Sequence, residues 1–392
     1  MSLEKGAGKQ SYQLGLLTFV HFLADCANNA VPGFLPVAMA YFTLDLSYGV
    51  GLLSVLGIGC NLLQIPLSKL GGKSRSPVWI ITGLILLGCS GLIGLLPRST
   101  PFIAVCGLLL VVSLGIAMVH PAGLRGVQAL EKLPAGMTTP IFMTGGFFGA
   151  ALAPLLAGLA VERFGLKGLL FFFPLTVLVA FGIWFSGIRL QTDGQNPAQK
   201  GEVFSPWNLW SLLAIATFLN CGSASFTGLV PYMLNKEHGF PLWYSGFAIM
   251  LFGGGSSAIS VLLGMYASRK RIDGTLLTSL FCGIPFAILF FCFAAYKWAL
   301  IFSFACGALC SSVFPIFVAM AKTGSGKYYL GVRMGLMVGG TWGVAGLVFL
   351  GVGILADHFT AKSVLMIAVP VFYLLSGITA VFTRKSAEKV QD

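Results

Sequence analysis

Long blocks of apolar residues, separated by short polar stretches, run through most of this chain. A block of about 20 apolar residues forms a helix that is long enough to cross a bilayer. Twelve blocks reach this length, so the pattern predicts an all-α membrane protein with twelve transmembrane helices. The predicted helices cover roughly 14–42, 49–71, 77–97, 101–127, 138–161, 166–188, 207–234, 241–267, 274–296, 298–321, 331–356 and 360–383.

The composition supports the membrane class. Of the 392 residues, 57% are hydrophobic and 9% are charged, whereas soluble globular proteins have about 25% charged residues. So few charges exclude a cytosolic enzyme. The sequence shows no nucleophile–base pair and no cofactor motif, so we predict neither enzymatic activity nor a bound cofactor.

The net charge of +12 is better explained by membrane topology than by nucleic-acid binding. If both termini are cytoplasmic, 18 of the 24 Lys and Arg residues lie on the inner side. Basic residues favour cytoplasmic loops, so we predict this orientation. The short loops favour a bacterial inner membrane. The expected partners are membrane lipids and a small-molecule or ion substrate, without nucleic acid, and we expect a monomer.

An internal repeat divides the chain near its middle. Gly33-Phe34-Leu35-Pro36 matches Gly228-Leu229-Val230-Pro231, and Met143 to Gly149 matches Met337 to Gly343, at offsets of 195 and 194 residues. A common offset is less expected by chance than any single match in a glycine-rich chain. We therefore predict an N-terminal six-helix half at 1–188, a cytoplasmic linker at 189–206 and a C-terminal half at 207–392.

Two related six-helix halves resemble the major facilitator superfamily. The segment Gly264 to Arg271 is similar to the superfamily's G-x-x-x-D-R loop motif, with Ser268 in place of Asp. Within the superfamily, His21-Phe22-Leu23-Ala24-Asp25, His120-Pro121 and Gly145-Gly146-Phe147-Phe148-Gly149 resemble fosmidomycin-resistance-like exporters. The resemblance implies secondary active transport by alternating access, with a site at the midplane between the halves.

Asp25 is the one acidic residue of twelve that lies deep in a predicted span. An ionisable side chain within the membrane is costly and points to function. His21, Asp25 and Asn28 fall at i, i+4 and i+7 of one helical face, and Asn29 borders that face. We therefore predict that Asp25 and His21 couple transport to protons. The alternative is that the pair only fixes helix packing.

The outer half of this first span should bend, because Pro32, Gly33 and Pro36 interrupt it.

His120 is the second candidate for proton coupling. Counting from the cytoplasmic ends of their spans places His120 and His21 at a similar depth, about 10 Å in. The alternative is a histidine that bonds a carbonyl freed by Pro121. Arg125 lies nearer the cytoplasmic end of the same span. It is either an anion contact for substrate or an interfacial arginine that snorkels towards water.

The second half offers polar but mostly uncharged candidates. Asn220 occupies the position that corresponds to Asp25 in the repeat. We predict substrate contacts from Asn28, Asn29, Arg125, Asn220, Ser223, Thr227, Phe314 and Trp342.

Taken together, these features predict proton-coupled export of a small organic molecule through a central cavity. One alternative is transport of a transition-metal ion or metal chelate by His21, Asp25 and His120, with Cys306 and Cys310 as further soft ligands. Another alternative is a membrane sensor or assembly factor that does not transport.

Overall fold

The computed structural model describes residues 2–133, 135–192, 205–267, 273–323, 333 and 335–384. Within these residues all regular elements are helical and no strand occurs. Eleven helical stretches of this part are long and apolar enough to cross a membrane. The all-α membrane class is confirmed, whereas the number of twelve crossings stays a prediction.

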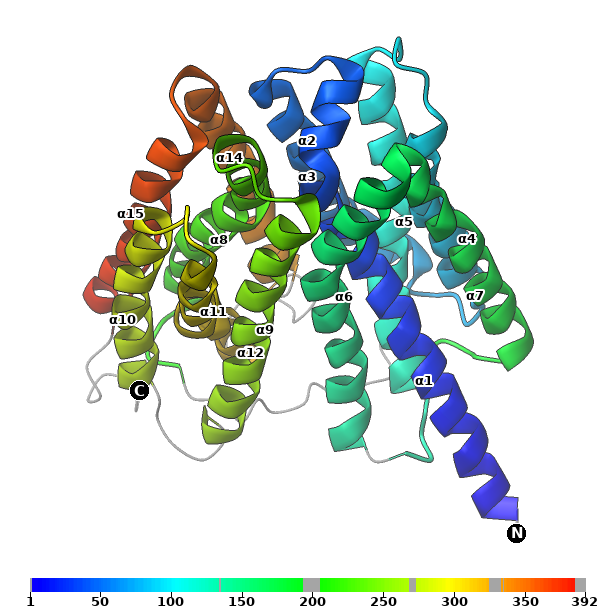
Figure 1. The fold of residues 1–392 in the computed structure, drawn as a ribbon. Helices are drawn as coiled ribbons and strands as arrows, with labels where there is room; N and C mark the ends of the chain where they lie inside the picture. The colour runs from blue at the N-terminus through cyan, green and yellow to red at the C-terminus, as the bar shows by residue number, and fades with distance from the viewer. Residues whose placement is uncertain are drawn as a thin grey trace. The chain divides into compact units, whose positions relative to one another are not determined.

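The chain forms two compact units. Unit 1 comprises Met1–Leu44 and Val55–Pro197. It holds α1 (Ser2–Asn29), α2 (Val31–Phe42), most of α3 (Leu46–Gly71), α4 (Val78–Gly88), the 3₁₀ helix η1 (Cys89–Leu95), α5 (Phe102–Gln128), α6 (Ala135–Phe164), the 3₁₀ helix η2 (Gly165–Phe171) and α7 (Phe172–Ser186). Figure 1 shows α1 alongside α6, and the two helices pack closely.

Unit 2 comprises Asp45–Ser54 and Ala198–Asp392. Beyond the start of α3 it holds α8 (Leu209–Tyr232), η3 (Met233–Glu237), α9 (Leu242–Ala267), α10 (Asp273–Cys292), η4 (Lys297–Ala299), α11 (Leu300–Leu309), η5 (Ser311–Val313), α12 (Phe314–Thr323), η6 (Gly335–Gly340), α14 (Thr341–His358) and α15 (Ala361–Phe382). Here η3 and η6 are π-helical, and η4 and η5 are 3₁₀.

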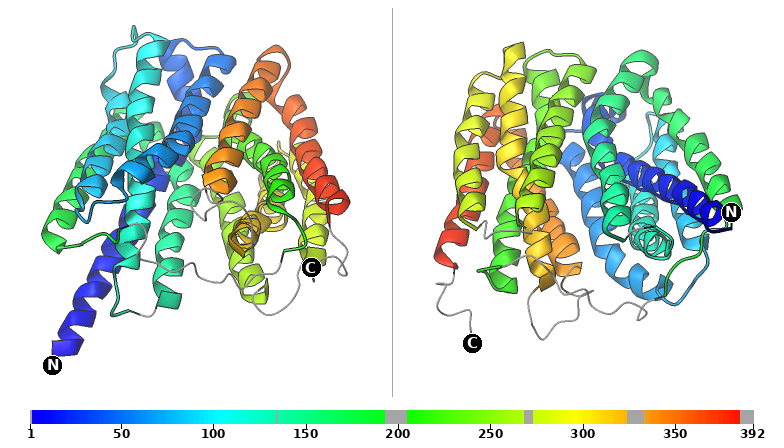
Figure 2. Two further views of the ribbon diagram at one scale, coloured as in Figure 1. Left: turned by 180° about the vertical axis from the view of Figure 1, so that it is seen from behind. Right: turned by 90° about the horizontal axis from the view of Figure 1, so that it is seen from below.

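The two units share a packing scheme. In unit 1, α1 packs on α6, and α4 packs on α5 and α7. In unit 2, α8 packs on α14, and α10 packs on α11 and α15. These pairs correspond along the chain, as expected for an internal repeat. Figure 2 shows the helices of each unit from two further directions.

The predicted bend in the first span is confirmed. α1 ends at Asn29 and α2 begins at Val31, with Pro32 in the first turn of α2. Proline suits this position because the first N–H groups of a helix have no partner within it. At Gly33 a Cβ atom would overlap the backbone of Pro154 in α6. Because Gly33 has no side chain, α2 lies directly against α6 beyond the bend.

One apolar helical stretch, Ile141–Ser186, is 46 residues long. As a straight helix it would extend about 69 Å, more than twice the ~30 Å thickness of a hydrocarbon core. It contains most of α6 together with η2 and α7, and the chain turns at Gly165, whose φ of 60° favours glycine. The predicted spans 138–161 and 166–188 fall on α6 and on η2 with α7.

A second helix break was not predicted. The span expected at 298–321 divides into α11 and α12 around Cys310. Pro315, the second residue of α12, has no N–H to offer the carbonyl of Ser311. Two predicted features lie partly outside the described residues. These are the linker at 189–206, in its residues 193–204, and the loop motif Gly264 to Arg271, in its last four residues.

Candidate functional site

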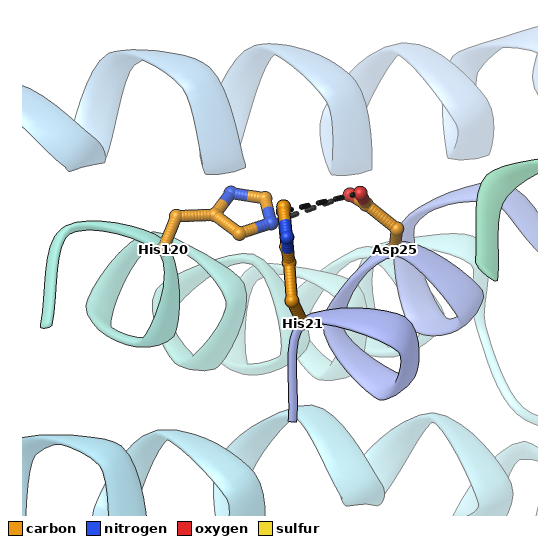
Figure 3. Close-up of side chains that lie close together, drawn as sticks. All are labelled: His21, Asp25 and His120. Carbon is orange, nitrogen blue, oxygen red and sulfur yellow. Dashed lines mark ion pairs between the residues drawn. The ribbon is translucent and has the colours of Figure 1, made fainter. Parts of the chain in front are cut away.

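Three side chains that the sequence singled out meet inside unit 1. His21 and Asp25 lie one turn apart on α1, and His120 approaches them from α5 (Figure 3). Nε2 of His21 is 3.4 Å from Oδ2 of Asp25, and Nε2 of His120 is 3.3 Å from Oδ1 of Asp25. The imidazole rings meet edge to face, with centroids 5.2 Å apart. We call His21, Asp25 and His120 the triad.

The orientation of His21 is fixed by α6. Nδ1 of His21 lies 2.9 Å from the carbonyl oxygen of Phe142, and the imidazole stacks on the Phe142 ring with centroids 4.3 Å apart. A carbonyl oxygen can only accept, so Nδ1 carries the hydrogen and donates it. In the neutral ring, Nε2 therefore presents a lone pair towards Asp25.

His120 has the opposite tautomer. Nε2 of Gln64, on α3, lies 3.4 Å from Nδ1 of His120. An amide nitrogen can only donate, so Nδ1 accepts and the hydrogen resides on Nε2. This hydrogen faces Oδ1 of Asp25, and His120 meets the carboxylate as a neutral donor.

One shared proton would complete the contact between His21 and Asp25. Without it, the lone pair of His21 Nε2 would face an ionised carboxylate oxygen at 3.4 Å, and two acceptors repel each other. A proton between them gives either an imidazolium–carboxylate or an imidazole–carboxylic acid pair. The triad then has no net charge, which suits the interior of a membrane. The geometry thus forms a site for one shared proton.

The triad is largely buried, but part of it is accessible to solvent. The exposed fraction of the side chain is 8% for His21, 18% for Asp25 and 20% for His120. The side chains of Asp25 and His120 are thus partly accessible, whereas Nε2 of His120 is itself buried.

Close packing of α6 against α1 positions the triad. At Gly146 a Cβ atom would overlap Oδ2 of Asp25 and crowd the imidazole of His21. At Gly145 and Gly149 a Cβ atom would overlap backbone carbonyl oxygens of α1. Small residues let membrane helices approach this closely. The Gly-Gly-Phe-Phe-Gly segment thus serves packing at the triad.

The two asparagines of α1 have different partners. Oδ1 of Asn28 lies 3.3 Å from the thiol of Cys60, which donates to it. Nδ2 of Asn29 donates to the backbone carbonyl of Asp25 at 2.9 Å. Asn28 thus contacts α3, whereas Asn29 bonds its own helix. Their roles in substrate binding stay predictions.

Arg125, in the last turn of α5, is buried against the C-terminal end of α3. Its Nη1 donates to the carbonyl oxygens of Gly71 at 2.7 Å and of Ser74 at 3.3 Å. A cation at a helix C-terminus satisfies free carbonyl groups and interacts favourably with the helix dipole. Arg125 therefore holds the loop after α3, and substrate contact by this residue stays a prediction.

Asn220 and Ser223 lie in a buried polar cluster of unit 2. Nδ2 of Asn220 donates to Oγ1 of Thr341 at 2.9 Å, so an amide–hydroxyl pair stands where unit 1 has the triad. The hydroxyl of Ser223 is 3.3 Å from that of Tyr373. Hydrogen bonding to neutral partners makes this cluster polar without charge.

The remaining candidates in unit 2 lie along the same helices or next to them. The hydroxyl of Thr227 donates to the carbonyl oxygen of Ser223 at 2.9 Å. The rings of Phe314 and Trp342 meet edge to face, with centroids 6.0 Å apart. These residues supply one hydroxyl and an aromatic pair.

The proposed soft-metal ligands divide between the units. His21, Asp25 and His120 each offer one ligand atom, and these three atoms lie within 4.8 Å of one another. Cys306 and Cys310 are buried in unit 2. The donor set that the structure brings together is therefore two imidazoles and one carboxylate.

Sequence reasoning missed several partners of these side chains. Gln64 could have been noticed in the sequence, because it is a polar residue inside an apolar block. Nothing in the sequence marks the carbonyl of Phe142, since every residue has a backbone carbonyl. Thr341 and Tyr373 become partners only through the packing of α8 against α14 and α15.

Similarity to known proteins supports the membrane-transport class. Over 390 residues the chain is 23% identical to the fosmidomycin resistance protein of Escherichia coli (strain K12), covering 96% of this chain and 93% of that protein. It is 27% identical to the methyl viologen resistance protein SmvA of Salmonella typhimurium (strain LT2) over 226 residues, which cover 55% of this chain and 41% of that protein.

Solved structures share the fold at low identity. A bacterial homologue of the human lysosomal transporter Spinster, in an inward-facing and occupied conformation, has a TM-score of 0.69 at 15% identity and covers 95% of both chains. A point mutant of the nucleoside transporter NupG has a TM-score of 0.67 at 13% identity, covering 95% of this chain and 98% of that one. A family model also matches residues 17–350. This chain belongs to the Major Facilitator Superfamily.

Proposed function

We propose that this protein is a secondary active transporter that exports a small organic molecule in exchange for protons by alternating access. Asp25, His21 and His120 form the coupling site. The observation that carries this proposal is the shared-proton geometry between Nε2 of His21 and Oδ2 of Asp25, 3.4 Å apart and shielded within unit 1.

The charge of the triad gives the coupling its physical basis. With the shared proton the group is neutral, and without it the group has one negative charge. A negative charge in a membrane interior is costly, so the triad must regain a proton or bind a cation before it is enclosed again. Loss and recovery of that proton on opposite sides of the membrane would drive exchange.

The substrate side rests on neutral polar and aromatic groups, with Arg125 as a single cation. Asn28, Asn29 and Arg125 of unit 1, with Asn220, Ser223, Thr227, Phe314 and Trp342 of unit 2, are the proposed contacts. Amides, hydroxyls and aromatic rings suit a small organic molecule. Relatives named for resistance to fosmidomycin and to methyl viologen favour export as the direction.

The topology completes the proposal. Twelve crossings follow if the 46-residue stretch Ile141–Ser186 crosses twice. Two six-helix halves, 1–188 and 207–392, would then place both termini in the cytoplasm of a bacterial inner membrane. We propose that the protein works as a monomer.

Transport into proteoliposomes with an imposed pH gradient tests the coupling. Fosmidomycin and methyl viologen are the first probes, and wild type is compared with Asp25→Asn and Asp45→Asn. Asp45 is exposed and distant from the triad in sequence, so it is a matched control for loss of one carboxylate. We expect gradient-driven transport from wild type and Asp45→Asn, and none from Asp25→Asn.

Size-exclusion profiles and far-UV circular dichroism of all three proteins show whether they fold. Uphill transport by Asp25→Asn that matches wild type and ignores pH would refute proton coupling at Asp25. A protein that binds a probe but moves none under any gradient would support a sensor instead.

A further inference from the structure

The spacing of the triad atoms matches the edge of a metal coordination polyhedron. Zinc binds imidazole nitrogen at about 2.0–2.1 Å and carboxylate oxygen at about 2.0–2.2 Å, usually with tetrahedral geometry. Two ligands of such an ion lie about 3.4 Å apart, by simple trigonometry. The two histidine–aspartate distances are 3.4 and 3.3 Å, and all three ligand atoms lie within 4.8 Å of one another.

His21 is already oriented as a metal ligand. Metal-bound histidines usually donate their second ring N–H to a carbonyl or carboxylate, which fixes the ring and its tautomer. Nδ1 of His21 makes this bond to the carbonyl of Phe142 at 2.9 Å. Once the proton shared with Asp25 leaves to water, the Nε2 lone pair is directed at the space beside Asp25, ready for an ion.

His120 needs one local change to become the second nitrogen ligand. Its hydrogen must move from Nε2 to Nδ1, where Gln64 is the neighbour. An amide offers a donor on one side and an acceptor on the other. If the Gln64 amide turns over, its oxygen accepts from Nδ1, and Nε2 of His120 becomes free to bind an ion.

The donor set selects the class of ion. Imidazole suits zinc, copper, iron and nickel, whereas magnesium and calcium prefer oxygen ligands. Two imidazoles and one carboxylate leave a fourth tetrahedral position for water. The side chains of Asp25 and His120 are partly exposed, so the group is not fully enclosed by the protein.

We propose that His21, Asp25 and His120 form a binding site for one divalent transition-metal ion of the Zn²⁺, Co²⁺ and Ni²⁺ type. This inference goes beyond the proposed export of an organic molecule, because it concerns metal binding by the resting protein.

Isothermal titration of the purified, tag-free full chain with ZnCl₂, after removal of metals by a chelator, tests the site. The variants are His120→Gln and Asp25→Asn. The matched controls are His238→Gln and His358→Gln, the other two of the chain's four histidines. We expect one zinc ion per chain, at least about tenfold weaker binding in the triad variants, and no change in the controls.

Titration with CoCl₂ adds a spectroscopic test, since tetrahedral Co²⁺ absorbs strongly in the visible range and octahedral Co²⁺ does not. Size exclusion checks that each variant is folded. The proposal is overturned if zinc does not bind, if the triad variants bind zinc as tightly as wild type, or if a control variant loses zinc binding. Equal affinity for Mg²⁺ and Zn²⁺ overturns it as well. Zinc binding is measured at equilibrium without a proton gradient, so such a failure leaves the proposed export untouched, and failure of proton-driven export leaves the metal site untouched.

Discussion

Oδ2 of Asp25 on α1 occupies the space that a side chain at Gly146 on α6 would need. The imidazole of His21 borders the same space. Gly146 is therefore part of the triad's enclosure, although it has no side chain. The close approach of α6 also delivers the Phe142 carbonyl that orients His21.

We predict that Gly146→Ala displaces Asp25 and His21 and lowers proton-driven transport at least about tenfold, which corresponds to about 1.4 kcal/mol in the transport barrier. Initial transport rates in proteoliposomes measure the effect. Gly107→Ala in α5 is the control, because a Cβ atom there meets nothing within 4 Å. Equal transport by both variants would show that the position of α6 does not matter to the triad.

Much of the triad was predictable from sequence because its key relationships are local. His21 and Asp25 share one helix, so their spacing of four residues fixes their proximity. The depth of His120 followed from counting residues along two spans at 1.5 Å each. The bend at Ala30 followed from the prolines beside it.

The rest depends on contacts between segments distant in the chain. Gln64 meets His120 only because α3 lies beside α5, and Phe142 meets His21 only because α6 lies beside α1. No residue type marks a carbonyl that accepts from a histidine. For Arg125 the sequence left open a substrate contact or an interfacial position, and its bond to the end of α3 appears only in the folded protein.

Asn220→Asp should destabilise unit 2. The amide of Asn220 donates to Thr341, whose own hydroxyl donates to the carbonyl of Met337 at 2.6 Å. A carboxylate at 220 would face an acceptor with no hydrogen to share, so we expect a loss of about 1–3 kcal/mol in unfolding free energy. Thermal unfolding in detergent measures this loss.

Asn208→Asp is the matched control for that change. Asn208 caps α8 by accepting from the backbone N–H of Ser211 at 2.9 Å. Aspartate accepts equally well at this position and favours the positive end of the helix dipole. An unfolding temperature that falls as far in Asn208→Asp as in Asn220→Asp would contradict the proposed role of the Asn220 donor.

Arg125→Lys should also lower stability although it keeps the charge. Nη1 of the guanidinium donates to two carbonyl oxygens, those of Gly71 and Ser74, and lysine carries its ammonium on a shorter and more flexible stem. We expect a loss of about 1–2 kcal/mol, seen as a lower unfolding temperature. Arg189→Lys, an exposed position, should leave the temperature unchanged. A stable Arg125→Lys protein with weakened substrate binding would instead favour substrate contact.

His238, which follows η3, should make stability depend on pH. Burial and the nearby ammonium of Lys362 lower the pKa of His238 below its ordinary value of 6.5, although Glu237 partly opposes them. At a pH below 6.5 the unfolded chain therefore binds a proton at this residue more readily than the folded protein does. Stability from this source is present above pH 6.5 and is lost as the pH falls towards the lower folded pKa.

His238→Gln removes the titrating group, so we expect its unfolding temperature to fall less than that of wild type between pH 7.5 and pH 5.5. The triad is present in both proteins, so its own response to pH cancels in the comparison. Parallel curves would mean that His238 takes up its proton equally in the folded and unfolded chains. A gap that widens as the pH falls, with the variant above wild type, is the result that burial of a neutral His238 beside Lys362 requires.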